Sequence, residues 1–173
     1  LYMKLEEIYT LQKNAVFNLA LSYVQNTQDA EEITQDVFIS VHKNITKFKY
    51  QSSLKTWVYR ITINTSLDFL KAQKRNKRKV LFQARSIDST TIQVANFDHP
   101  GVQLEDKEDL QRLFQQINRL PENQKTALIL LKIEQEKTAE VAKIMKLTPK
   151  AVESLFSRAK INLKKFIEQT EGL

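Results

Sequence analysis

Residues 138–159 read TAEVAKIMKLTPKAVESLFSRA, and this pattern predicts two helices joined by a very short turn. Thr138 can cap the first helix and Thr148 the second, because a hydroxyl at that position accepts from a free backbone N–H. Pro149 follows at the first helical position, where the N–H that proline lacks would have no partner in the helix. Two helices around so short a turn are typical of a helix-turn-helix.

The second of these helices has one apolar side and one polar side. Its apolar positions recur at helical spacing from Val152 to Phe166, which predicts the buried face. The N-terminal half of such a helix docks in the major groove of duplex DNA, where Arg and Lys donate to guanine and Glu accepts from cytosine. We predict that duplex DNA is bound by Thr148, Lys150, Glu153, Ser154, Ser157, Arg158 and Lys160.

The overall composition favours a basic, helical protein. The 173 residues include 27 Lys and Arg against 20 Asp and Glu, which gives a formal net charge of +7. Such an excess attracts polyanions, so nucleic acid and anionic membrane surfaces are the candidate partners. No apolar run approaches the ~20 residues that span a bilayer, so we expect no direct membrane insertion. Only 2 Gly and 3 Pro are present, which leaves few tight turns and favours an all-α fold.

Charge divides the chain into three parts. Residues 1–80 carry 13 Lys and Arg against 7 Asp and Glu, residues 81–109 carry 2 against 6, and the remainder carries 12 against 7. The middle part is rich in Ser, Thr, Asp and Asn and lacks a sustained helical period. We therefore predict two small helical domains, at 1–80 and 108–173, joined by a linker at 81–107. The free chain can then mask its DNA surfaces by packing one domain against the other.

The first domain shows three helical stretches. Asn26 or Thr27 can cap the second helix, and Asp29 in its first turn suits the positive end of the helix dipole. Ser53 can cap a third, long helix. Residues 44–53 form a polar and aromatic connection between these two helices.

A dense basic run closes the long helix. Residues 71–79 read KAQKRNKRK, so six of the nine are Lys or Arg and none is acidic. The simpler interpretation is a solvated helix end, where cations also suit the dipole. So dense a run after several aromatic residues fits contact with a DNA backbone better.

Two aromatic residues stand in the polar connection. Phe48 and Tyr50 lie beside Lys47 and Lys49, where they could stack on an unpaired base as single-strand binders do. Aromatic residues more often belong to a core, and we assign Trp57 to helix packing. From the residues alone, base stacking and core packing remain equal alternatives for the first two.

No set of residues predicts catalysis. The two histidines, His42 and His99, lie in different segments, and the chain has no Gly-rich phosphate loop and no Cys. Glu31 and Asp36 would need a pocket and a raised pKa to act as acid and base, and on a surface helix they are solvated. We expect no enzyme activity, metal, cofactor or small-molecule substrate. The absence of Cys permits a reducing compartment.

Several stretches together resemble a known family. Residues 29–38 (DAEEITQDVF) resemble the acidic helix of bacterial extracytoplasmic-function (ECF) sigma factors. Residues 56–64 (TWVYRITIN) and the basic run resemble their promoter-melting helix, and residues 120–124 (LPENQ) with 140–159 resemble their C-terminal domain. The resemblance covers nearly the whole chain in the right order. The short linker also fits this class, because housekeeping sigma factors carry an additional central domain.

The resemblance implies a cytoplasmic, exchangeable subunit of RNA polymerase that recognises the −35 and −10 promoter elements and helps to open the DNA. Its helix from Pro149 would read the −35 element. An anti-sigma factor would hold it inactive. The clamp helices of core RNA polymerase would be bound by Asp29, Glu32, Gln35, Asp36 and Phe38.

The −10 element, including a flipped base, is implied to bind the connection and the long helix. Asn64 would lie near the start of recognition, and the basic run would hold the backbone. The full implied set is Phe48, Lys49, Tyr50, Gln51, Ser52, Arg60, Asn64, Lys71, Lys74 and Arg75.

Two residues depart from the family pattern, and two other functions remain alternatives. Lys146 stands where the family often has Gly in the turn, and Glu153 where many members have Lys. The main alternative is a stand-alone helix-turn-helix regulator, which usually dimerises on two half-sites. That function leaves residues 29–53 unexplained, and the sequence offers no obvious helix for dimerisation. A helical adaptor without a nucleic-acid partner is opposed by the two basic segments.

Overall fold

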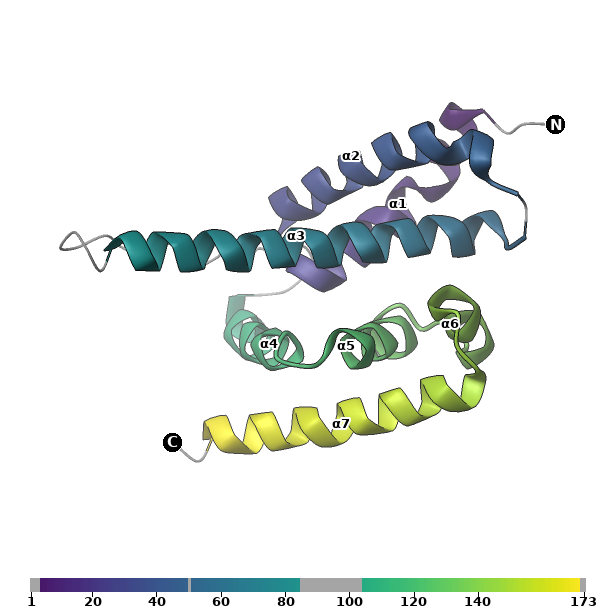
Figure 1. Ribbon diagram of the computed structural model, residues 1–173. Helices are drawn as coiled ribbons and strands as arrows, with labels where there is room; N and C mark the ends of the chain where they lie inside the picture. The colour runs from purple at the N-terminus through teal and green to yellow at the C-terminus, as the bar shows by residue number, and fades with distance from the viewer. Residues whose placement is uncertain (1–3, 50, 85–103, 172–173) are drawn as a thin grey trace.

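The computed structural model describes residues 4–49, 51–84 and 104–171, and within these ranges the chain forms helices and no strand. The all-α prediction is therefore confirmed. The N-terminal helices are α1 (Leu5–Val24), α2 (Thr27–Asn44), the 3₁₀ turn η1 (Ile45–Lys47) and α3 (Leu54–Ala84). The C-terminal helices, also shown in Figure 1, are α4 (Leu104–Ile117), α5 (Glu122–Leu128), the π-helical turn η2 (Ile129–Ile133), α6 (Thr138–Met145) and α7 (Pro149–Glu171).

The N-terminal helices pack around one apolar core. α2 begins where predicted, because the Asn26 side chain accepts a hydrogen bond of 2.8 Å from the backbone N–H of Asp29. Ile33 and Val37 of α2 and Val58 of α3 are fully buried in this core. Full burial of each such side chain contributes about 1.5–3 kcal/mol to the stability of the fold. The apolar face of α2 therefore holds this helix against the N-terminal core.

The long helix α3 is capped as predicted and is longer than predicted. The Ser53 hydroxyl accepts a 3.1 Å hydrogen bond from the backbone N–H of Thr56. α3 continues to Ala84, and α4 begins at Leu104. Helices thus extend into both ends of the segment at 81–107 that was predicted as a linker, and residues 85–103 lie outside the described part of the chain.

The predicted helix-turn-helix is present, with one cap corrected. Thr148 caps α7 as predicted, since its hydroxyl accepts a 3.2 Å hydrogen bond from the N–H of Ala151. Thr138, in contrast, is the first residue of α6, and Lys137 occupies the cap position without a side-chain hydrogen bond to the helix. The cap prediction was wrong by one residue because Lys137 already adopts the extended backbone from which the helix starts.

Lys146 supplies the left-handed turn between α6 and α7. Its φ is 56° and its ψ is 44°, a conformation that favours Gly. The N–H of Leu147 donates to the carbonyl of Ala142 at 2.9 Å. The N–H of Lys146 donates to the carbonyl of Lys143 at 3.3 Å. These two bonds close a Schellman motif, so the turn forms without Gly at the cost of local backbone strain.

The N-terminal and C-terminal helices share a second apolar core. Tyr23 of α1 and Tyr59 of α3 are buried together with Leu130 of η2 and Val141 of α6. Figure 1 shows α4, α5 and α6 between α3 and α7. The C-terminal helices therefore lie against α3 through α6 and its neighbours, while α7 runs along their opposite side.

Candidate DNA and polymerase interfaces

The outer side of α7 gathers the residues predicted to read duplex DNA. Thr148, Lys150, Glu153, Ser157, Arg158 and Lys160 are all exposed, and Ser154 is half-buried. Arg158 donates a 2.8 Å hydrogen bond to the hydroxyl of Ser154, one helical turn earlier. The structure thus brings the whole predicted set onto one open helix surface with both charged and neutral hydrogen-bonding groups.

The inner side of α7 is fixed by several contacts with the other C-terminal helices. Val152 and Ala159 are fully buried. Asn162 donates a 2.9 Å hydrogen bond to the Gln124 side chain of α5. The Arg119 guanidinium lies 4.3 Å from the centre of the Phe166 ring, a cation–π contact. These contacts hold the reading side of α7 in a defined orientation.

The polar side of α2 carries the predicted polymerase-binding residues. Glu32, Gln35 and Asp36 are exposed. Asp29 is half-buried, and its carboxylate accepts a 3.0 Å hydrogen bond from the Gln73 side chain of α3. Three of the four polar residues are therefore free to meet a partner, while Asp29 also ties α2 to α3.

Two neighbouring apolar residues of α2 lie in different environments. Phe38, predicted to bind polymerase, is only 8% exposed, and its ring meets that of Tyr9 edge-on at 4.8 Å. The next residue, Ile39, is 51% exposed. Sequence reasoning missed Ile39, although it lies outside the apolar stripe of α2 and could have been found as an unexplained apolar residue among the acidic ones.

The connection before α3 exposes polar side chains to solvent, whereas its aromatic residue Phe48 is buried. Lys49 and Gln51 are exposed, and Ser52 is half-buried. Phe48 is 9% exposed and stacks on Trp57 with ring centres 4.8 Å apart and an interplanar angle of 28°. Phe48 cannot stack on a base in this conformation, because Trp57 covers one face of its ring and only 9% of the residue is exposed. Tyr50, the other predicted stacking residue, lies outside the described residues.

The basic end of α3 forms a positively charged surface. Lys71, Lys74, Arg75 and Arg78 are exposed and recur at helical spacing on one side of α3. Together with Asp68 they line a hollow of about 640 Å³. Four cations around one hollow create a local potential that attracts phosphate groups. Asn64, one turn before Asp68, is also exposed.

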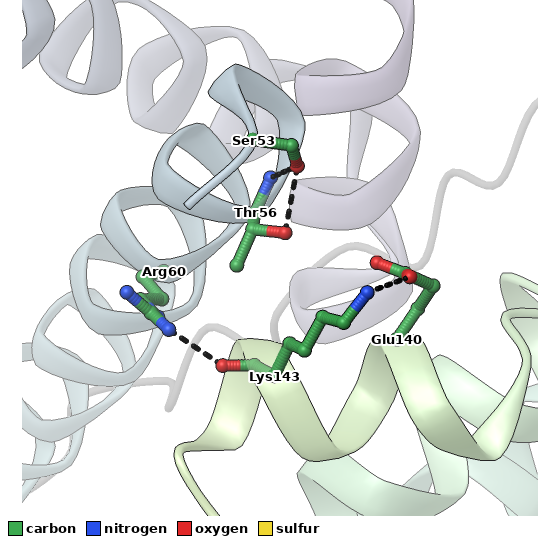
Figure 2. A network of polar contacts seen from close by, with 5 residues as sticks. All are labelled: Ser53, Thr56, Arg60, Glu140 and Lys143. Atoms are coloured by element: carbon green, nitrogen blue, oxygen red, sulfur yellow. Dashed lines mark hydrogen bonds and ion pairs between the residues drawn. The ribbon is translucent and has the colours of Figure 1, made fainter. Parts of the chain in front are cut away.

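Arg60, predicted to bind the −10 element, makes two hydrogen bonds to the C-terminal helices. Its Nη2 donates to the carbonyl of Lys143 at 2.6 Å, and its Nε donates to the carbonyl of Ile144 at 3.1 Å. Figure 2 shows the first of these bonds, beside the ion pair of Lys143 with Glu140 one turn earlier in α6. The ammonium of that pair lies 2.7 Å from the carboxylate. Both carbonyls belong to the last turn of α6, the negative end of the helix dipole.

Further polar pairs connect the N-terminal and C-terminal helices. The hydroxyls of Tyr23 and Thr126 lie 2.8 Å apart, and both residues are buried. The Ser22 hydroxyl donates to the Glu134 carboxylate at 2.8 Å. Burial raises the pKa of Tyr23 and of Glu134 above their ordinary values, although the hydroxyl partner of each opposes the rise.

Lys125 of α5 is a buried cation beside this contact. Its side chain lies under the Tyr23 ring, with the ammonium 5.8 Å from the ring centre and 3.4 Å from the Asn118 side-chain oxygen. Loss of hydration on burial, reinforced by the charge of Lys74, lowers the pKa of Lys125 to about 8. A single neutral oxygen and an aromatic face replace its water only in part.

Neither a metal centre nor a membrane span is found in the part of the chain that the structure describes. No group of three or more His, Cys, Asp or Glu residues is arranged there to hold a metal ion. None of the described helices is both long and apolar enough to cross a bilayer.

Two family models match the chain in order. The model of sigma-70 region 2 matches residues 8–76, which contain most of α1–α3. The model of sigma-70 region 4 matches residues 110–163, which contain the helix-turn-helix. Regions 2 and 4 together define a transcription initiation factor of the sigma-70 class.

Curated relatives narrow the class. The ECF RNA polymerase sigma-E factor of Haemophilus influenzae is 31% identical over 86% of this chain and 79% of its own length. The sigma-E factor of Escherichia coli K12 is 29% identical over 86% of this chain and 78% of the relative. The sigma-H factor of Pseudomonas aeruginosa is 28% identical over 90% of this chain and 82% of the relative. The chain belongs to the extracytoplasmic-function sigma factors.

Two solved structures share the fold. One is CnrH in complex with the cytosolic domain of CnrY, with a TM-score of 0.63, 18% identity, and coverage of 95% of this chain and 88% of that one. The other is the sigma factor RpoE of Bartonella quintana in complex with the anti-sigma factor NepR. Its TM-score is 0.60 and its identity 20%, and the match covers 94% of this chain and 96% of that one. At these identities the likeness concerns the arrangement of helices.

Proposed function

We propose that this sigma factor reads the −35 promoter element with the outer side of α7. The observation that carries the proposal is the exposed set from Thr148 to Lys160, which lies on the second helix of a helix-turn-helix. Arg158 and Glu153 offer a donor and an acceptor for base edges in the major groove. Lys150 and Lys160 are placed to meet backbone phosphates. The firm anchoring of the inner side of α7 supports this role, because base reading needs a fixed register.

The −10 element is assigned to the exposed side of α3 and to the connection before it. Asn64, Lys71, Lys74 and Arg75 offer hydrogen bonds and positive charge along one helix. Lys49, Gln51 and Ser52 supply polar groups at its start. Capture of a flipped base offsets the few kcal/mol that unstacking costs. Phe48 requires a change of its stacking on Trp57 before it can contribute.

Core RNA polymerase is assigned to the polar side of α2. Glu32, Gln35 and Asp36 form an exposed row there, and Ile39 adds an exposed apolar contact beside them. Carboxylates around an apolar side chain are suited to a basic protein surface, where charge complementarity guides encounter and the apolar contact slows release. Phe38 supports this surface from the inside.

We further propose that the chain acts in the cytoplasm, performs no catalysis, and is held inactive by an anti-sigma factor. The proposal of an anti-sigma factor is supported by two fold neighbours whose structures contain a partner, one of which is the anti-sigma factor NepR. A stand-alone duplex-binding regulator is disfavoured because region 2 is present and carries the row on α2.

The polymerase contact can be tested by complex formation with bacterial core RNA polymerase. The purified chain should co-migrate with core enzyme in gel filtration, and Asp36→Lys should weaken the complex at least tenfold. Glu168→Lys makes the same charge change on α7, away from α2, and should leave the complex intact. Equal binding of both variants would remove α2 from the interface, and no complex with the wild type would overturn the proposed function.

A further inference from the structure

The turn between α6 and α7 places a lysine where glycine is favoured. Lys146 has a left-handed backbone, with a φ of 56° and a ψ of 44°, and its Cβ makes this conformation costly. Among the described residues only two others, Gln25 and Gln135, have a positive φ without being glycine. Gln25 is buried, and its side chain donates a 2.7 Å hydrogen bond to the carbonyl of Ser22, so packing accounts for its place.

No contact within the described part of the chain accounts for the side chain of Lys146. It is exposed, and it forms no ion pair or hydrogen bond with any residue there. The first carboxylate before it along the chain, that of Glu140, is paired with Lys143 at 2.7 Å. The first turn of α7 contains no acidic residue. The ammonium of Lys146 can therefore bind an external anion without leaving an internal partner.

Backbone strain alone does not indicate a function, because Gln135 has a φ of 54° and is exposed as well. Gln135 is neutral, however, and precedes α6, whereas Lys146 is charged and follows it. Lys146 also lies two residues before Thr148 and four before Lys150, which belong to the exposed set assigned to −35 DNA. Charge and position together, rather than strain, indicate a role for Lys146 at the DNA surface.

The docking geometry of a helix-turn-helix carries this turn past the edge of the major groove. The first helix crosses the DNA backbone, and the N-terminal residues of the second helix enter the groove. The turn that joins them therefore lies near the phosphates that border the groove. Two peptide units span at most about 7.6 Å, so the side chain of Lys146 starts close to the Thr148 cap. Its flexible four-carbon stem lets the ammonium reach a phosphate beside that cap.

We propose that Lys146 binds a backbone phosphate at the edge of the −35 major groove, a contact that the Gly of many family members cannot make. This inference rests on the proposed role of α7. A phosphate contact carries no sequence information, so Lys146 strengthens binding to every duplex, whereas Arg158 selects among them. The left-handed lysine thus lowers the stability of the free chain and raises its affinity for DNA.

The central variant is Lys146→Gly, which removes the cation and relieves the backbone at once. It should bind every duplex about three- to tenfold more weakly at about 0.1 M salt, and the slope of log affinity against log salt concentration should fall by about 0.9. Its stability toward urea should rise at the same time. A purely structural role of Lys146 would not combine higher stability with weaker binding and a smaller salt dependence.

Two further variants at the same position separate charge from backbone strain. Lys146→Arg keeps the positive charge and should retain both the affinity and the salt slope of the wild type. Lys146→Asn has no charge but tolerates the left-handed conformation, so it should bind as weakly as Lys146→Gly. Fluorescence anisotropy over a salt series measures each variant, with a duplex that the full chain selects from a random library and with an unrelated duplex.

Two controls match the separate effects of Lys146→Gly. Gln135→Gly relieves the other exposed left-handed residue without a change of charge, and it should leave duplex affinity and salt slope unchanged. Lys43→Ala removes an exposed cation from α2, which lies on the far side of α3 from α7 (Figure 1). It should lower the salt slope much less than Lys146→Gly does.

The inference is overturned if Lys146→Gly binds duplex with the affinity and salt slope of the wild type. It is also overturned if Gln135→Gly or Lys43→Ala weakens binding as much as Lys146→Gly. Failure of the proposed role of α7 looks different, because Arg158→Ala would then leave binding to the selected duplex unchanged.

Discussion

The guanidinium of Arg60 on α3 donates a 2.6 Å hydrogen bond to the backbone carbonyl of Lys143 on α6. The same carbonyl also accepts the backbone N–H of Lys146 at 3.3 Å, and Nε of Arg60 donates to the next carbonyl, that of Ile144, at 3.1 Å. Arg60 thus adds side-chain donors to the C-terminus of the first helix of the helix-turn-helix. One side chain thus serves both the packing of the free chain and, by its place in the promoter-melting helix, the proposed contact with DNA.

The turn residue Lys146 gives a stability prediction. Lys146→Gly should raise the free energy of unfolding by roughly 0.5–1 kcal/mol, because Gly adopts the left-handed conformation without the strain of a Cβ. The matched control is Lys165→Gly in the interior of α7, which should lower it by about 1 kcal/mol. Urea unfolding measures both. A loss of stability in Lys146→Gly would show that the turn is not strained.

The buried hydroxyl pair gives a second prediction. Tyr23→Phe should lower the free energy of unfolding by about 1–2 kcal/mol, because the buried hydroxyl of Thr126 loses its 2.8 Å partner. Tyr9→Phe removes a hydroxyl from a ring that is 47% exposed and should change stability by less than about 0.5 kcal/mol. Thermal unfolding compares the two, and equal effects would contradict a structural role for the pair.

Lys125 predicts a pH dependence of a definite sign. Its pKa of about 8 in the folded chain lies below the ordinary value of 10.5, so the unfolded chain binds more protons between these values. The free energy of unfolding should therefore rise with pH between about pH 8 and about pH 10. Above that range the raised pKa of Tyr23 acts in the opposite direction, since ionisation then favours the unfolded chain.

Lys125→Met separates this effect from other titrations. The lowering of the Lys125 pKa from 10.5 to about 8 corresponds to about 3 kcal/mol, at ~1.4 kcal/mol for each unit. Removing the buried charge should recover part of this and raise the free energy of unfolding at neutral pH by about 1–2 kcal/mol. The variant should also lack the rise with pH. Urea unfolding across the range measures both effects, with Lys165→Met as the exposed control. Persistence of the rise in Lys125→Met would assign it to another group.

Two residues of α7 should differ in how their loss affects DNA binding. Arg158→Ala should cost about 1–3 kcal/mol on the selected duplex and relax its sequence preference, because Arg reads a base edge. Lys160→Ala should weaken all duplexes alike and reduce the salt dependence by about one phosphate contact. Binding isotherms over a series of salt concentrations distinguish the two. Identical behaviour of the variants would contradict base reading by Arg158.

The helix-turn-helix was predictable because its determinants are local. The Thr148 cap, Pro149 and the apolar spacing of α7 lie within a few turns of each other in sequence, and the structure confirms each of them. The same holds for the Asn26 and Ser53 caps. Cap hydrogen bonds and helical spacing need no knowledge of distant contacts.

Features that depend on distant contacts were not predictable from the sequence. Arg60 donates hydrogen bonds to carbonyls more than eighty positions away along the chain. No sequence pattern near Arg60 indicates that its partners are backbone carbonyls. Phe48 carried equal signals for base stacking and core packing, and only the position of Trp57 decides for packing. The packing of one set of helices on the other was expected as a way to mask DNA surfaces, but the contact buries Tyr59 and Ile63 of α3 and leaves Asn64, Lys74 and the outer side of α7 exposed.

The most direct test of the proposed function is initiation by a reconstituted holoenzyme. Bacterial core RNA polymerase and the purified chain are tested on promoters selected from a random library, with transcripts and permanganate-reactive thymines measured together. We expect chain-dependent transcripts and an opened −10 region, with Asn64→Ala lowering opening more than polymerase binding. Tight duplex binding by the chain alone, with no complex and no transcript from cognate core enzyme, would contradict the proposed function.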